Sequence, residues 1–207
     1  MNLLIDTCSA ALFLAIADGR CVRHLFYERM VKGHAEAIVP ALATLLSNAG
    51  LHGDASFDKI GVCVGPGSFT GLRVGLAVAR ARSALSGVPL VALNRLQCLA
   101  ASHAPHEGPI RIEIDARRGE HFVQRFDDLC APLAEPMTVA NASLGDLQTL
   151  YPQDRVAGDV ETPEMFAAGI AQLTHDQPGI SHQAVTPLYV RAPDAKAQPA
   201  KLRTRQT

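Results

Sequence analysis

The residues best suited to chemistry form a glycine-rich stretch, GPGSFTG (65–71), between an apolar run and a long helical pattern. Free backbone N–H groups and the helix dipole favour an anion at such a junction. The candidate phosphate-binding residues are Gly65, Gly67, Ser68 and Thr70. The stretch matches neither the Walker pattern nor the dinucleotide fingerprint, because Leu72 and Arg73 follow it and Thr70 replaces the third glycine. A tight turn whose Ser68 or Thr70 caps the helix is an equally good interpretation.

Acidic and histidine side chains give weaker signals. Asp6 closes a short apolar strand and is either a remnant of a magnesium–water site or an ordinary turn residue. No two of the eight histidines are four residues apart, so the sequence lacks a His-x-x-x-His metal pair on one helix face. His34 and Glu36 start a helical pattern, where Glu36 suits the helix dipole better than acid–base chemistry. We therefore predict neither a catalytic residue nor a metal site.

The composition is that of a soluble globular protein, with 48% hydrophobic and 19% charged residues. The longest uninterrupted apolar run, Ala10–Ala17, is far shorter than the roughly 20 residues of a membrane helix. The first residues, MNLLIDT, do not resemble a secretory signal, so we expect a cytoplasmic protein with buried, reduced cysteines. With 19 basic and 20 acidic residues, the chain lacks the excess positive charge needed to bind bare nucleic acid alone.

The elements that position these residues occur twice. Hydrophobic patterns predict strands at 2–6, 11–19, 21–28, 59–65 and 87–93, and helices at 34–50 and 70–86. After the linker APHEGP (104–109), a strand, a polar turn and a second strand recur over 110–128, with Asp115 where Asp6 stood. We expect domains at 1–104 and 105–191, the second degenerate, and a flexible tail at 192–207. Duplicated meander-plus-helix units indicate an α/β, two-domain fold of the actin, sugar-kinase and Hsp70 type (ASKHA, ribonuclease-H-like).

The helix expected at 70–86 carries a small residue at every fourth position. These residues are Gly71, Gly75, Ala79 and Ser83. Glycine inside a helix costs up to about 1 kcal/mol relative to alanine, so close packing against a neighbour would have to compensate. That neighbour is either the protein's own sheet or first helix, or another protein. Leu72, Val78 and Leu85 offer a separate apolar side for the core, which would leave the small-residue stripe to a partner.

Several motifs together resemble the TsaB (YeaZ) family of bacterial proteins. The most specific are GPGSFTGLR (65–73) and IDARRGE (114–120), and the similarity covers most of residues 2–196 in order. The resemblance implies the ASKHA fold and an inactive paralogue of TsaD, the catalytic subunit that makes N6-threonylcarbamoyladenosine (t6A) at adenosine 37 of tRNAs reading ANN codons. It further implies a non-catalytic scaffold that binds and activates TsaD, with the ATPase TsaE docking on the pair and a homodimer forming when TsaD is absent.

The resemblance also implies where partners bind. The surface would lie on the helices at 34–49 and 70–86. The expected partner-binding residues are Gly71, Arg73, Gly75, Ala79, Ser83, Ile38, Leu42 and Leu45. The family pattern implies no cofactor of the chain's own, ATP or ADP at the interface with TsaD, contact with tRNA only through the complex, and no membrane association.

An enzyme with its own ATP site, either a transferase or a glycoprotease-like peptidase, is the alternative. Its nucleotide site could draw only on Asp6, Asp115 and the loop at 65–71, and a serine protease would need a His and an Asp near Ser68. Arg117 and Arg118, at a predicted hairpin tip, could meet tRNA phosphates or partner carboxylates, or could simply be solvated.

Overall fold

The computed structural model describes residues 1–160 and 162–191, and the tail expected at 192–207 lies outside them. The strands are β1 (Asn2–Asp6), β2 (Ala11–Asp18), β3 (Cys21–Arg29), β4 (Lys59–Gly65), β5 (Leu90–Asn94), β6 (Ile110–Arg117), β7 (Glu120–Phe126), β8 (Met137–Ala140) and β9 (Arg155–Ala157). The helices are α1 (His34–Asn48), α2 (Phe69–Ser86), α3 (Arg95–Ser102), α4 (Leu144–Leu150) and α5 (Pro163–Asp176), with a 3-10 turn η1 (Asn141–Ser143). No helix within the described ranges is long and apolar enough to cross a membrane.

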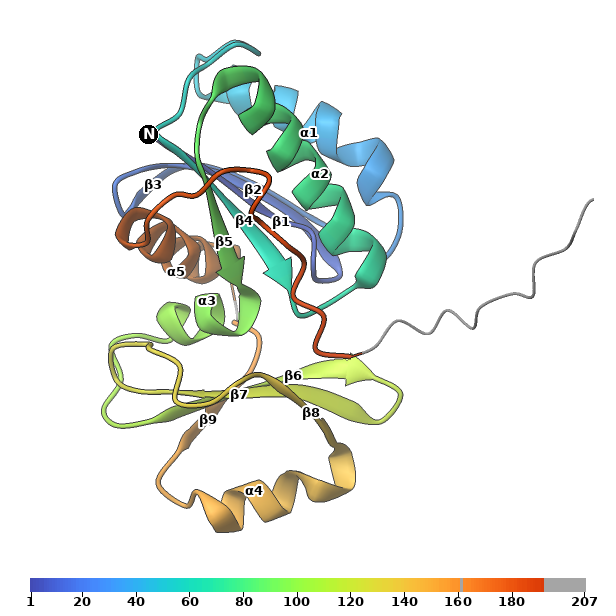
Figure 1. Cartoon of the computed structure of the whole chain (residues 1–207), viewed down its shortest axis with the longest axis vertical. Coiled ribbons are helices and arrows are strands. Elements are labelled where there is room, and N and C mark those ends of the chain that lie inside the picture. Colours follow the sequence, from blue (N-terminus) through green and yellow to red (C-terminus); the bar gives the residue numbers. More distant parts are fainter. Residues whose placement is uncertain (161, 192–207) are drawn as a thin grey trace, which may run out of the picture.

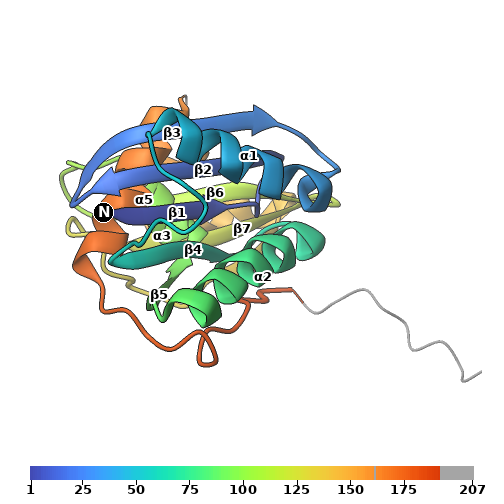
Figure 2. The ribbon, with the colours of Figure 1, turned by 90° about the horizontal axis from the view of Figure 1, so that it is seen from above.

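The first sheet has the strand order β3-β2-β1-β4-β5. The expected meander of β1, β2 and β3 is confirmed, and β4 and β5 extend the sheet by parallel pairing. Helices α1 and α2 cover one face, and α3 and α5 cover the other (Figures 1 and 2). Because both faces are covered, every residue of β1 is buried, which explains the three consecutive apolar residues at its centre, Leu3, Leu4 and Ile5.

The second sheet is smaller, with the order β8-β7-β6-β9. The hairpin of β6 and β7 repeats that of β1 and β2, as the sequence predicted, and α4 lies on its far side (Figure 1). Helices α3 and α5 pack against each other between the two sheets. Their apolar residues join both sheets into one core that includes Leu99, Ile112 and Ile170.

The C-terminal part of the described chain returns to the first sheet, while the predicted domain bounds 1–104 and 105–191 stay a prediction. Helix α5 contacts β1, β3, β4 and β5, although its sequence gave only a weak helical pattern. Beyond it, Ile180 exchanges two backbone hydrogen bonds with Leu90, and the Leu188 N–H donates to the Val64 carbonyl at 2.8 Å. Residues 163–191 therefore pack against the first sheet, which is formed by residues of the N-terminal half of the chain.

The small-residue stripe of α2 faces the protein's own sheet. A methyl group added at Gly71 would lie 2.0 Å from the Thr7 carbonyl oxygen, and one at Gly75 would lie 2.5 Å from Thr7 Oγ1. The Thr7 hydroxyl donates to the Gly71 carbonyl and accepts the Gly75 N–H. Ala79 and Ser83 are buried as well. Gly71 and Gly75 thus bring α2 close to the end of β1, and contact of the four residues with a partner stays a prediction.

The predicted contact residues of α1 also face inward. Ile38, Leu42 and Leu45 pack against the first sheet in the same core as Leu76. By contrast Leu85, which the sequence assigned to the core side of α2, is 90% exposed. Of the predicted partner-binding set only Arg73 lies on the outer surface.

We expect Gly75→Ala to lower the free energy of unfolding by about 1–3 kcal/mol, since the new methyl group would overlap Thr7 and crowd Ile5. Urea denaturation of the purified chain measures this. Ala77→Leu, on the exposed side of the same helix, is the control and should change stability by less than about 0.5 kcal/mol. Equal stability of Gly75→Ala and the wild type would contradict the close approach of α2 to β1.

Candidate functional site

A cavity of about 710 Å³ lies between the first sheet and the β6–β7 hairpin. The carboxyl end of β1 leads into it through Cys8 and Ser9, and the loop after β4 borders it with Pro66, Gly67 and Ser68. The opposite wall comes from Asp115, Ala116, Arg117, Arg118 and Phe122. Ligand pockets in open α/β sheets form at the carboxyl ends of the strands, so this cleft is the candidate site.

The glycine-rich loop borders the cleft but folds around its own chain. The Ser68 hydroxyl caps α2 by accepting the Gly71 N–H at 3.1 Å, and the Ser68 N–H donates to the Cys8 carbonyl at 2.8 Å. A side chain at Gly67 would lie 2.2 Å from that carbonyl oxygen. The capped-turn interpretation is thus confirmed with Ser68 as the cap. Anion binding by Gly65, Gly67, Ser68 and Thr70 stays a prediction, since two of the loop's N–H groups already have acceptors.

Gly65 and Phe69 of this loop meet the C-terminal segment. Gly65 has φ +120°, and a side chain there would lie 2.6 Å from the Leu188 carbonyl oxygen. Phe69 stacks on Tyr189 with ring centroids 5.1 Å apart. The Arg73 guanidinium lies over the same Phe69 ring, 5.1 Å from its centroid. The segment around residue 189 is therefore part of the cleft wall.

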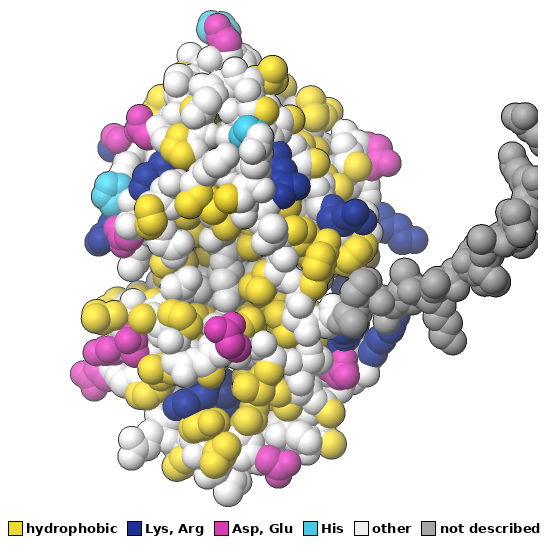
Figure 3. Space-filling view, viewed as in Figure 1, with side chains coloured by type: hydrophobic (Ala, Val, Ile, Leu, Met, Phe, Trp, Pro, Cys, Tyr) yellow, Lys and Arg dark blue, Asp and Glu magenta, His cyan; other side chains and the backbone are white. Residues whose placement is uncertain are grey.

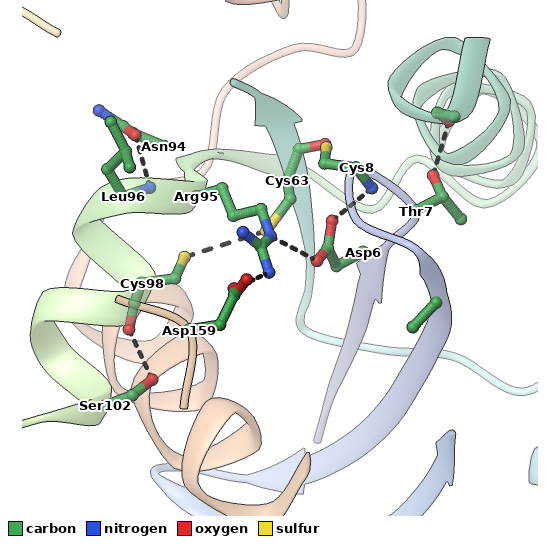
Figure 4. Close-up of polar contacts among 12 residues, drawn as sticks. Asp6, Thr7, Cys8, Cys63, Asn94, Arg95, Leu96, Cys98, Ser102 and Asp159 are labelled. Atoms are coloured by element: carbon green, nitrogen blue, oxygen red, sulfur yellow. Dashed lines mark hydrogen bonds and ion pairs between the residues drawn. The ribbon is translucent and has the colours of Figure 1, made fainter. Parts of the chain in front are cut away.

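A buried ion pair closes the floor of the cleft (Figure 4). Asp6, 1% exposed, accepts the Cys8 N–H at 2.7 Å through Oδ1 and faces Arg95 Nε at 3.3 Å through Oδ2. Arg95 Nη2 donates to Asp159 Oδ1 at 2.7 Å. Burial alone would lower the pKa of the Arg95 guanidinium, but the Asp6 and Asp159 carboxylates outweigh it and raise that pKa above its usual value.

The ion pair joins three separate parts of the chain. Asp6 ends β1, Arg95 begins α3, and Asp159 lies between β9 and α5. Asn94 caps α3 by accepting the Leu96 N–H at 2.9 Å, which fixes the first turn that carries Arg95. The guanidinium also lies 5.4 Å from the Phe166 ring centroid on α5. Asp6 is therefore both a turn residue and half of an ion pair.

Asp115, the counterpart of Asp6 in the second hairpin, has no such role. Its side chain is exposed, and its Oδ1 accepts the Arg117 N–H at 2.7 Å. Arg117 and Arg118, two and three residues after Asp115, have φ values of 64° and 60°. They therefore form a left-handed turn at the exposed hairpin tip. The repeated pattern in the sequence has thus diverged into a buried acid and a surface acid.

Cys8, His34 and His103 are engaged within the fold. Burial raises the pKa of the Cys8 thiol, which weakens it as a nucleophile. His34 is buried and bonds the Ala11 carbonyl at 3.2 Å, and His103 bonds the Gly158 carbonyl at 3.1 Å. Among residues 1–160 and 162–191, no group of three or more His, Cys, Asp or Glu side chains is arranged to hold a metal ion.

Sequence reasoning missed Arg95 and Asp159, the residues that complete the ion pair with Asp6. A signal for Arg95 was present, because a charged residue two positions after the apolar run LVAL (90–93) lies at the edge where β1 also ends. Asp159 carried none, since it comes from a segment without a clear hydrophobic pattern.

Comparison with known proteins identifies the class. The order of the first sheet, the second hairpin sheet and the cleft between them define the ASKHA fold. A crystal structure from Pseudomonas aeruginosa, described as an uncharacterized protein with similarity to peptidase YEAZ, matches with a TM-score of 0.70 at 23% identity, over 92% of this chain and 99% of that one. That likeness supports the fold.

The sequence comparisons identify the family. The family model of TsaD, tRNA N6-adenosine threonylcarbamoyltransferase, matches residues 28–188. The tRNA threonylcarbamoyladenosine biosynthesis protein TsaB of Bacillus subtilis is 30% identical over 74% of this chain and 67% of its own length. An uncharacterized Mycobacterium tuberculosis protein, Rv3421c, is 30% identical over 94% of this chain and 93% of its own length. The chain therefore belongs to the TsaB (YeaZ) family, a branch of the TsaD family.

We expect Arg95→Met to destabilise the protein by about 3–5 kcal/mol, because it leaves the buried Asp6 carboxylate without its cation. Adding Asp6→Asn should restore part of the loss, since the amide oxygen still accepts the Cys8 N–H and carries no charge. Thermal or urea unfolding of the single and double variants measures both effects. Arg23→Met, at an exposed pair with Asp18, is the control and should cost less than about 1 kcal/mol.

A double variant no more stable than Arg95→Met alone would show that Arg95 acts through packing and not through the Asp6 charge.

Proposed function

We propose that this chain is a non-catalytic scaffold for t6A formation at adenosine 37 of tRNAs reading ANN codons, and that it binds and activates the catalytic subunit TsaD. Membership of the TsaB family supports a part in t6A biosynthesis. The observation that carries the non-catalytic role is the Asp6–Arg95 pair. The acid at the end of the first strand, where this fold could place a magnesium–water site, is already matched by a guanidinium.

The electrostatics of this floor oppose a metal–nucleotide site. A divalent cation approaching Asp6 would have to displace Arg95, which is itself buried and paired with both carboxylates. Two cations cannot share one buried carboxylate without strong repulsion. Asp6 therefore stabilises the fold through Arg95, and the catalytic groups for t6A formation would have to come from a partner.

The outer faces of α1 and α2 suit the partner surface. The two helices lie side by side on the first sheet (Figure 2). Small or apolar residues are prominent among the exposed ones and include Ala35, Val39 and Ala43 on α1 and Ala77, Ala81 and Leu85 on α2. Val39 is 63% exposed and Leu85 is 90% exposed. Short side chains on the outer faces let the helices of a partner approach closely. Such a contact does not require the buried small residues Gly71, Gly75, Ala79 and Ser83.

The remaining parts of the proposal follow from the family. TsaD is the partner in a heterodimer on which the ATPase TsaE docks, and a homodimer through the same faces forms when TsaD is absent. The complex acts in the cytoplasm. ATP or ADP, where it takes part, lies at the interface with TsaD, beside the cleft that Ser68 and Phe69 border.

A nucleotide-binding enzyme is the second candidate, and the size of the cleft favours it. A volume of about 710 Å³ falls within the range of small-molecule sites. Calorimetric titration of the isolated chain with Mg-ATP separates the two candidates. The scaffold predicts no binding below millimolar concentration, whereas micromolar affinity would support the enzyme.

We expect depletion of this protein in its host to lower the t6A content of tRNA, because the scaffold is required for the modification. Mass spectrometry of tRNA nucleosides measures the change, and a complementing copy should restore it. An unchanged t6A content in depleted cells would overturn the proposed function.

We expect Ala43→Arg to abolish association with TsaD while the variant stays folded, since the long charged side chain would project from an exposed position of α1 into the interface. Size-exclusion chromatography with light scattering measures complex formation. Ala131→Arg is the matched control, because Ala131 is exposed and lies outside the helices of the proposed surface. Normal association of the Ala43→Arg variant with TsaD would contradict an interface on the outer face of α1.

A further inference from the structure

We propose that residues 188–191 form a latch that holds the cleft at its present width. The latch joins the first sheet to the tip of the β6–β7 hairpin, so the cleft opens on this side when the latch is released at Arg191. This inference concerns access to the cleft, and it does not depend on the proposed function.

The chain reaches the latch along the edge of the first sheet. After α5 it crosses in front of β5 and β4 and then descends toward the hairpin (Figure 1), and Figure 2 shows the same path passing α2. Ile180 pairs with Leu90 of β5. Val185 is buried in the core of the first sheet, and its carbonyl accepts a hydrogen bond from the Arg80 guanidinium. The segment that leads to the latch is therefore fixed to the first sheet.

The first end of the latch also lies on the first sheet. The Leu188 N–H donates to the Val64 carbonyl at 2.8 Å, and the Leu188 carbonyl approaches Gly65 closely. The next residue, Tyr189, stacks on Phe69 at the start of α2. Figure 3 shows this side of the molecule, where hydrophobic side chains lie next to Lys and Arg side chains at the right of the view. Leu188 and Tyr189 therefore move with the first sheet.

The second end of the latch is an arginine on the hairpin. Arg191 donates to the Ala116 carbonyl at 3.0 Å and pairs with the Glu120 carboxylate. Its guanidinium also lies 5.8 Å from the Phe122 ring centroid. The planar guanidinium has five N–H donors in a fixed arrangement, so it can bond a carbonyl and a carboxylate at once. Arg191 therefore moves with the hairpin.

The short distance between the two ends gives the latch its effect. Arg191 is the third residue after Leu188, and an extended chain spans at most roughly 11 Å over that length. At the other side of the hairpin, α3 packs against β6 and β7 (Figure 1). The cleft of about 710 Å³ lies between, since its lining includes both Arg95 of α3 and Arg191. Release of Arg191 thus lets the hairpin tip move away from the first sheet while α3 still holds the hairpin.

Cys8 can report the opening of the cleft. It lines the cleft and is 2% exposed, whereas Cys21 is exposed on β3, and Cys63 and Cys98 lie in the core. The full-length native chain is alkylated with N-ethylmaleimide, and mass spectrometry of each cysteine peptide gives the rate at every position. We expect Arg191→Ala to raise the rate at Cys8, relative to Cys21, by about fivefold or more, because a protected thiol reacts through the open state.

A second variant and a matched control define the cause. Glu120→Gln removes the charge that faces Arg191 and leaves the Ala116 bond, so it should raise the Cys8 rate by a smaller factor. Arg20→Ala breaks another exposed arginine–carboxylate pair, with Asp176, outside the cleft lining. It should leave the Cys8 rate within about twofold of the wild type. Circular dichroism of each variant establishes that it is folded.

Two results would overturn the latch. One is an unchanged Cys8 rate in both Arg191→Ala and Glu120→Gln. The other is an equal increase at Cys8, Cys63 and Cys98, because it would show that the whole core loosens and that the cleft does not open separately. Neither TsaD nor tRNA enters these measurements, so failure of the latch and failure of the proposed function are distinguishable.

Discussion

The Asp6–Arg95 ion pair is the interaction on which the arrangement of the two sheets depends. Removing a carboxylate and a guanidinium from water costs several kcal/mol each, and their attraction offsets this only when further hydrogen bonds satisfy both groups. Here Cys8 and Asp159 supply those bonds. Since the partners come from β1, α3 and the segment before α5, the pair fixes how the layer between the sheets sits on the first sheet. Its contribution is therefore to specify the packing more than to add stability.

The contact of α2 with β1 imposes a second constraint on the same end of the sheet. Gly71 and Gly75 bring the helix so near that Thr7 bonds its backbone directly. Leu72, Leu76 and Ala79 are buried beside this contact, whereas Ala77, Ala81 and Leu85 turn outward. Close packing on the inner side of α2 therefore leaves small and apolar side chains among those exposed on its outer side. The two glycines of α2 are thus explained by its close approach to the end of β1.

Much of the fold could be predicted from the sequence because its signals are local. Continuous apolar runs identified β1 and β4, and Ser68 three residues before Gly71 identified a helix cap. The sequence could not predict which neighbour packs against the small-residue stripe of α2. Small residues permit a close approach to the protein's own sheet and to another protein equally well. The pairing of Arg95 with Asp159 joins residues 64 positions apart and left no local pattern. The return of α5 to the first sheet was missed for the same reason, because tertiary contacts decide it.

The duplicated hairpin shows how one pattern came to serve two purposes. In the first copy the acid after the strand is buried and matched by Arg95, so its charge is used for folding. In the second copy Asp115 is exposed and orders a turn that presents Arg117 and Arg118 to solvent. Asp6 is thus matched within the fold, whereas Asp115 keeps an exposed carboxylate in the lining of the cleft. The duplicated acid therefore serves the interior in one copy and the rim of the cleft in the other.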